Sequence, residues 1–183
     1  ETTRDGLASS EGNSPEAIAA AQQRADTLGI LAGTERATGS GITLTIEDAD
    51  GAVDAAALLD GFGAGAGAVV TFTGLVRGDG GLTALDIEHY PGMTERALAD
   101  HAQAALDRFG LTDVLVVHRF GHLPVGAPIM MVATAARHRR AAFDAADFLM
   151  DWLKSRAPFW KREISAAGPG DWVAAADQDE AAL

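Results

Sequence analysis

Residues 138–164 read HRRAAFDAADFLMDWLKSRAPFWKREI and contain, side by side, the two kinds of element from which the chain is built. Apolar side chains recur at helical spacing over 138–154, which predicts an amphipathic helix. Its buried stripe is expected to consist of Phe143, Ala146, Leu149 or Met150, and Leu153. Pro158 prevents that helix from continuing unbent, so FWKREI (159–164) is expected to form a strand.

The rest of the chain alternates between strand and helix patterns without a regular βαβ repeat. Further strands are expected at 42–46, 67–76, 82–90, 114–120, 128–135 and 171–175. The strands 67–76 and 82–90 are expected to form a hairpin around the turn GDGG, and GHLPVG is the expected turn between 114–120 and 128–135. A helix is expected at 94–109, and Asp54 is expected to cap a short one. The mixture predicts an α+β fold, with a mixed or antiparallel sheet packed against helices.

The chain is expected to hold one compact domain with loose ends. Residues 1–41 form an expected N-terminal extension, partly disordered, with a possible helix at 15–28 where Ser14 and Pro15 resemble a helix start. The compact domain is expected to cover 42–175, and 176–183 is a polar tail.

Composition excludes several classes of partner and chemistry. The formal net charge is −12, which argues against nucleic acid or an anionic membrane as the main partner but not against an anionic small substrate. No apolar run approaches the roughly 18 residues that a membrane span needs, and the N-terminus does not resemble a secretory signal, so a cytoplasmic location is expected. The chain has no cysteine, and we expect no metal and no cofactor.

The lysines are unusually few and lie close together. The chain contains two, Lys154 and Lys161, against twelve arginines. Arginine keeps its proton in proteins, whereas lysine can release one, so the retained lysines suggest proton transfer or nucleophilic chemistry. Two surface lysines that fall together by chance would give the same pattern.

Two basic segments could bind an anion. Arg77 follows the predicted strand 67–76 and precedes a glycine-rich loop. Residues 137–140, Arg-His-Arg-Arg, lie where a strand passes into a helix, and the N–H groups of a helix start favour anions. Solvated surface arginines are the alternative at both places. Among the other histidines, His118 is expected to be structural, and His89 could line a site.

Four segments carry a resemblance to a known family. They are VVTFTGLVRG (69–78), IEHYPGMTE (87–95), HRFGHLPVG (118–126) and HRRAAFDAADFLMDWLKSRAPFWKRE (138–163). In this order they resemble signature segments of the molybdopterin synthase catalytic (large) subunit family, the MoaE family, over about residues 42–175. The likeness implies an α+β fold of the α/β-hammerhead type.

The resemblance implies a sulfurtransferase of molybdenum cofactor biosynthesis. Family members place two sulfurs on cyclic pyranopterin monophosphate to form the dithiolene of molybdopterin. The sulfur arrives on a small ubiquitin-like carrier with a C-terminal Gly-Gly thiocarboxylate. Two large subunits form a homodimer, which becomes a heterotetramer with two carriers.

The family's functional residues can be matched to positions of this chain. Its two lysines correspond to Lys154 and Lys161, expected to be catalytic, and its substrate-binding residues to Arg77, His138 and Arg139. The sequence departs from the family at Leu75, where a polar or basic residue is common, and in the short GDGG loop. Two other hypotheses remain open at this point: a related module that binds a ubiquitin-like partner without chemistry, and a different enzyme acting on a phosphorylated small molecule.

Overall fold

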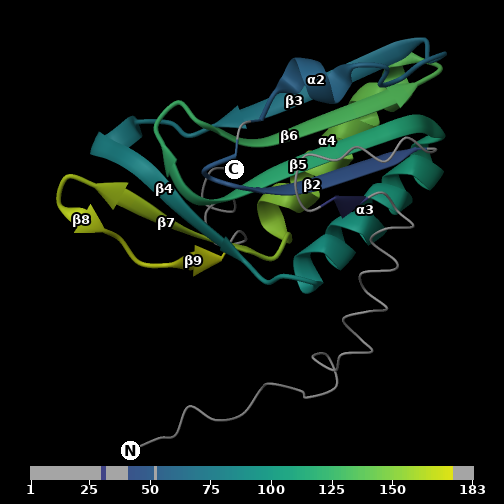
Figure 1. Cartoon of the computed structure of the whole chain (residues 1–183). Helices are drawn as coiled ribbons and strands as arrows, with labels where there is room; N and C mark the ends of the chain where they lie inside the picture. The colour runs from purple at the N-terminus through teal and green to yellow at the C-terminus, as the bar shows by residue number, and fades with distance from the viewer. Residues whose placement is uncertain (1–29, 32–40, 52, 175–183) are drawn as a thin grey trace, which may run out of the picture.

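The computed structural model describes residues 30–31, 41–51 and 53–174, and its elements form an α+β fold (Figure 1). The strands are β1 Ile30–Leu31, β2 Ile42–Asp48, β3 Ala68–Leu75, β4 Leu82–His89, β5 Leu111–Pro124, β6 Pro128–Ala136, β7 Phe159–Ser165, β8 Gly168–Pro169 and β9 Val173–Ala174. The helices are α2 Ala55–Leu59, α3 Met93–Phe109 and α4 Arg139–Ser155, with a 3-10 turn at Asp79–Gly81. The expected helix 15–28 and the tail 176–183 lie outside the described residues. The predicted fold class is confirmed.

The strands form one mixed sheet in which β5 is the shared member. Its first part, Leu111–His118, pairs with β6, and the span Val114–Phe120 pairs with β2 in parallel. Its last part, Gly121–Pro124, pairs with β4, which in turn pairs with β7. The change of partner falls at Gly121, whose φ of 92° favours glycine. An added Cβ there would also lie 2.9 Å from the Cβ of Ala49.

The structure corrects two expectations about turns. GHLPVG was expected to be the turn before the next strand, but β5 continues to Pro124 because Gly121 redirects it toward β4. The hairpin expected between 67–76 and 82–90 is wrong. β3 pairs with β6, and β4 pairs with β5 and β7. Around the GDGG turn, Val76 exchanges backbone hydrogen bonds with Gly126 and Ala127, which directs the chain away from β3.

Two residues of the expected N-terminal extension pair with the sheet. Ile30–Leu31 was assigned to the extension, yet it forms a short strand parallel to β2, with Ile30 opposite Leu44. At the other end of the chain, β9 lies within the expected edge strand 171–175 and pairs with β7. Asp54 caps α2 as predicted, since its carboxylate accepts hydrogen bonds from the N–H groups of Ala56 and Ala57.

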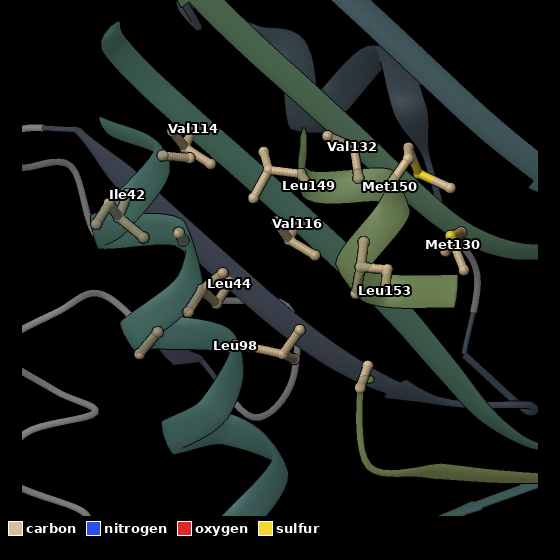
Figure 2. Packing of buried hydrophobic residues seen from close by; sticks show 14 of the residues in the cluster. Ile42, Leu44, Leu98, Val114, Val116, Met130, Val132, Leu149, Met150 and Leu153 are labelled. Carbon is tan, nitrogen blue, oxygen red and sulfur yellow. The ribbon is translucent and has the colours of Figure 1, made fainter. Parts of the chain in front are cut away.

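The main core lies between the sheet and helices α3 and α4 (Figure 2). Buried side chains of α4 are Ala142, Ala145, Ala146, Leu149, Met150 and Leu153. Phe143 was expected on this stripe, but it is 59% exposed. It follows Ala142 by one residue, about 100° around the helix, which turns it away from the sheet. The opposite face of β5 and β6 packs against Leu58, Leu59 and Phe62, in and after α2.

Candidate functional site

The two lysines lie on consecutive elements joined by a short turn. Lys154 is in the last turn of α4, where a cation is favourable near the helix C-terminus, and its side chain is exposed. The helix ends at Ser155, and Pro158 then leads into β7. Lys161 is the third residue of β7 and is half-buried.

The register of β7 fixes which face Lys161 occupies. Lys161 lies opposite Ile87 of β4, and Phe159 lies opposite His89. Because side chains alternate along a strand, Lys161 shares its face with Phe159, while Trp160 and Arg162 point to the other. Phe159 is buried, so the face that carries Lys161 is continuous with the core.

Arg77 lies two residues beyond the end of β3 and is exposed. Its guanidinium Nε is 3.6 Å from a carboxylate oxygen of Asp79, and both side chains are more than 80% exposed. Such an exposed pair contributes little to stability. The neighbouring Leu75 pairs with Pro128, which places Arg77 near the start of β6.

His138 and Arg139 lie between the end of β6 and the start of α4, whereas Arg77 lies near the start of β6. His138 is the N-cap residue of α4 with no side-chain capping hydrogen bond, and Arg139 opens the helix. Both are exposed. The nearby Arg140 donates a 3.0 Å hydrogen bond to Asp144, four residues along the helix.

The geometry divides four of the five expected site residues into two groups. Arg139 and Lys154 are separated by fifteen residues of α4, about 22 Å along the axis. Helix α4 follows β6 after a short turn, so its C-terminal end returns toward the start of β6, where Arg77 lies. The chain therefore brings Arg77 and Lys154 to one end and places His138 and Arg139 at the other.

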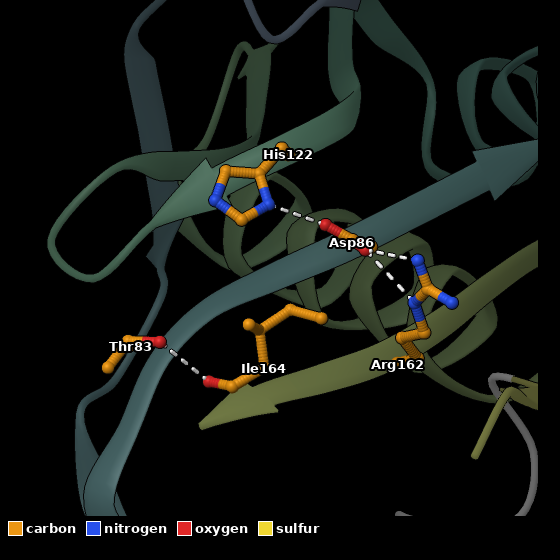
Figure 3. A network of polar contacts seen from close by, with 5 residues as sticks. All are labelled: Thr83, Asp86, His122, Arg162 and Ile164. Carbon is orange, nitrogen blue, oxygen red and sulfur yellow. Dashed lines mark hydrogen bonds and ion pairs between the residues drawn. The ribbon is translucent and has the colours of Figure 1, made fainter. Parts of the chain in front are cut away.

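A polar network holds the strand that carries Lys161 (Figure 3). Arg162 of β7 donates hydrogen bonds of 3.0 and 2.8 Å to Oδ2 of Asp86 on β4. His122 of β5 donates from Nδ1 to Oδ1 at 2.6 Å. Burial alone would raise the pKa of Asp86, but the hydrogen bonds and charges of Arg162 and His122 outweigh it and lower that pKa. The network joins three strands behind Lys161.

Buried His118 and half-buried His89 lie on the side of the sheet that Lys161 shares. The ring of His118 stacks on Phe159 with centroids 3.5 Å apart, and His89 lies 4.7 Å from Phe120. Burial lowers the pKa of both, that of His118 to about 3. The sequence allowed His89 to line a site but gave no reason to connect His118 with Lys161, since the contact depends on the strand arrangement.

The described residues provide no group of three His, Cys, Asp or Glu side chains that could hold a metal ion. Within the same residues, none of the helices is long and apolar enough to cross a membrane. A shallow cleft beside the GDGG turn is lined by Asp79, Leu82, Glu163 and the β7–β8 turn, and contains none of the five expected site residues.

Comparison with known proteins shows the family of this chain. The family model described as MoaE protein matches residues 45–156. The molybdopterin synthase catalytic subunit of Cereibacter sphaeroides is 66% identical over 121 residues, covering 66% of this chain and 82% of the relative. The Rhizobium meliloti protein of the same name is 55% identical over 118 residues, covering 63% and 76%.

Solved structures share the fold as well. The molybdopterin biosynthesis MoaE protein from Burkholderia ambifaria superposes with a TM-score of 0.64 and 41% identity, covering 79% of this chain and 96% of its own. The matched family segment includes Arg77, His138, Arg139 and Lys154, and it ends just before Lys161. The chain belongs to the MoaE protein family, whose curated members are molybdopterin synthase catalytic subunits.

Proposed function

We propose that this chain transfers two sulfurs from a thiocarboxylated carrier protein to cyclic pyranopterin monophosphate, forming the dithiolene of molybdopterin. The observation that carries the proposal is the position of the two lysines. They are the only ones in the chain, and they stand on either side of one turn, at the end of α4 and in β7. The name catalytic subunit, borne by the relatives, supports a second subunit as partner.

The roles of the residues follow from their charge and exposure. Exposed Lys154 interacts with the terminal carbonyl of the carrier, and half-buried Lys161 is the acid/base group nearest the substrate carbons. Arg77, His138 and Arg139 bind the cyclic phosphate and the pterin through charge-assisted hydrogen bonds. Each transfer forms a carbon–sulfur bond on the substrate as a carbon–oxygen bond there breaks, and water then hydrolyses the bond between that sulfur and the carrier's acyl carbon. The carrier leaves as a carboxylate, and two carriers are consumed.

The sulfur must come from outside this chain. It contains no cysteine, so it cannot carry a persulfide or form a thioester. A Gly-Gly tail suits a narrow channel because glycine lets the backbone pass closely. A carboxylate-like terminus is also attracted to lysines and arginines, although the whole chain is acidic. The protein acts in the cytoplasm, without cofactor or metal of its own.

A homodimer would unite the two groups of site residues. Strand β3 pairs with β6 on one side, and no other described strand pairs with it. Its exposed apolar residues are Val69, Phe72 and Leu75. If two copies pair through these edges in antiparallel fashion, the Leu75 end of one β3 meets the Ala68 end of the other. Since Ala68 lies opposite Ala136, just before His138, Arg139 of one protomer then approaches Arg77 and Lys154 of its partner.

The proposal is tested by turnover of the cyclic pterin with a purified carrier. The chain alone should form no product, and adding the thiocarboxylated carrier should start turnover with about two carriers consumed per dithiolene. The carboxylate form of the carrier should bind but support no reaction. Sulfur incorporation from inorganic sulfide alone, at a rate matching the carrier reaction, would contradict the proposal.

A further inference from the structure

His118 is a buried side chain with one nitrogen left free. The residue is 0% exposed, and its Nδ1 lies 2.9 Å from the carbonyl oxygen of Arg119. A carbonyl can only accept, so Nδ1 carries the proton and Nε2 is an unprotonated acceptor. Nε2 is buried and has no hydrogen-bond partner among the described residues. Buried polar atoms are nearly always paired, so this lone pair calls for a physical explanation.

The neighbours of His118 lead to Lys161. The imidazole stacks on Phe159, with an angle of 14° between the rings, and Lys161 follows Phe159 by two residues on the same face of β7. Burial is the main cause of the lowered pKa of His118, and the charges of Lys161 and His89 lower it further, whereas the hydrogen bond to Arg119 opposes the shift. The ammonium of Lys161 is thus close enough to act electrostatically on the imidazole.

The other ionisable groups in this region are Arg119 and His89, and each also has a buried nitrogen, Nε of Arg119 and Nδ1 of His89, without a hydrogen-bond partner among the described residues. The guanidinium of Arg119, the next residue of β5, binds the carbonyls of Ala49, Gly51 and Pro128. His89 has a lowered pKa of its own, caused by burial and opposed by Glu95 of α3. Lys161 is the cation whose charge acts on the imidazole and which shares the face of Phe159, so its ammonium is the donor that fits the Nε2 acceptor.

We propose that His118 is a positioning residue for Lys161, whose ammonium is held by donation to the free Nε2 lone pair of the buried imidazole. The four-carbon stem of Lys161 is flexible, and rotation about it can present the ammonium to Nε2. The stacked Phe159 and the Arg119 carbonyl fix the imidazole, so the lone pair has one direction. The inference rests on the proposed role of Lys161, but its central contact can be tested without turnover.

The test uses the fact that the chain has only two lysines. The full chain is treated briefly with an amine-acylating reagent, and mass spectrometry gives the labelling rate of Lys161 relative to Lys154. His118→Phe keeps a ring on Phe159 but removes the acceptor. In this variant the ratio should rise about threefold or more, because the ammonium of Lys161 no longer has the Nε2 acceptor to donate to. His101→Phe is the matched control: His101 also stacks on aromatic rings, 4.4 Å from Phe148 and 4.5 Å from Trp152. Its ratio should not change.

A second pair of variants separates positioning from packing. His118→Gln can place an oxygen near the former Nε2, whereas His118→Asn reaches only the former Nδ1. With the carrier and the cyclic pterin, the Asn variant should lose tenfold or more in kcat with KM nearly unchanged, and the Gln variant should recover most of it. An unchanged labelling ratio in His118→Phe, or equal kcat for Gln and Asn with equal losses in Tm, would overturn the inference. A changed labelling ratio with Lys161→Arg fully active would instead refute the proposed function and leave the contact standing.

Discussion

Arg162 and Asp86 face each other across β7 and β4, and the guanidinium donates two hydrogen bonds to one carboxylate oxygen. Arg162 also lies 4.7 Å over the ring of Trp172. The pair is mostly shielded from solvent, since the Asp86 side chain is 17% exposed and that of Arg162 32%. It therefore fixes the register of the strand on which Lys161 is carried.

Replacement of Asp86 tests this network. Asp86→Asn should lower the free energy of unfolding by about 2 kcal/mol, because it leaves Arg162 partly buried without its counter-charge. Urea unfolding followed by circular dichroism measures the change. Asp144→Asn is the control, since its ion pair with Arg140 is exposed and should cost about 0.5 kcal/mol or less. Equal losses in the two variants would show that the network contributes no more to the free energy of unfolding than an exposed ion pair does.

The pH dependence of stability should reveal buried His118. Burial holds its pKa at about 3 in the folded protein, against 6.5 for an ordinary histidine. Below about pH 6.5 the unfolded chain binds a proton that the folded protein does not, so stability falls by up to about 1.4 kcal/mol per pH unit from this group. Above pH 6.5 both states are neutral and the contribution is flat.

Urea unfolding at a series of pH values between 7 and 4.5 measures that slope. His118→Gln has no such proton to bind and should show a shallower loss on the acid side. His138→Gln, at an exposed position, should keep the slope of the parent protein. Identical slopes in all three proteins would mean that His118 titrates normally when folded.

The lysines should not tolerate replacement by arginine. Lys154→Arg and Lys161→Arg keep the positive charge but remove the ability to release a proton, so each should reduce kcat about 100-fold or more. Product formation with the thiocarboxylated carrier measures this, and Arg140→Lys serves as a control for exchange within the basic segment. Near-normal turnover in both lysine variants would show that charge alone suffices.

Mixed dimers test whether two protomers share one site. Arg139→Ala and Lys161→Arg should each be nearly inactive as pure dimers. Random mixing of subunits should restore about a quarter of the parent activity, since half of the dimers are mixed and each of these has one intact site of two. If all functional residues acted within one protomer, both sites of a mixed dimer would be damaged and mixing would restore nothing.

The sequence predicted the local elements better than their partners. The strands at 42–46 and 159–164 and the helix at 94–109 follow from alternation and helical spacing, and the structure confirms them. The hairpin between 67–76 and 82–90 was wrong because strand pairing depends on contacts with β6 and β5, distant in sequence. Phe143 was misplaced because its apolar character alone did not show which side of α4 faces the sheet.

For the candidate site too, the residue types could be predicted from the sequence, but their positions relative to one another could not. Lysine scarcity and the basic run before α4 could be recognised from the chain alone. The distance between Lys154 and the basic run could not be predicted from the chain alone, because it depends on the direction of α4 relative to β6. His118 was expected to be structural, but its nearness to Lys161 could not be predicted, since its stacking on Phe159 joins residues that are 41 positions apart.

The continuity of β5 has a mechanical consequence. One uninterrupted strand belongs to both parts of the sheet, with β2 and β6 along most of it and β4 beyond Gly121. Any hinge rotation of β4 and β7 against the rest would have to bend that strand and break ladder hydrogen bonds on one side. The sheet that carries Lys161 therefore behaves as one rigid unit. Access for successive sulfur donors must then be governed by exchange of the donor protein and its tail, not by opening of the sheet.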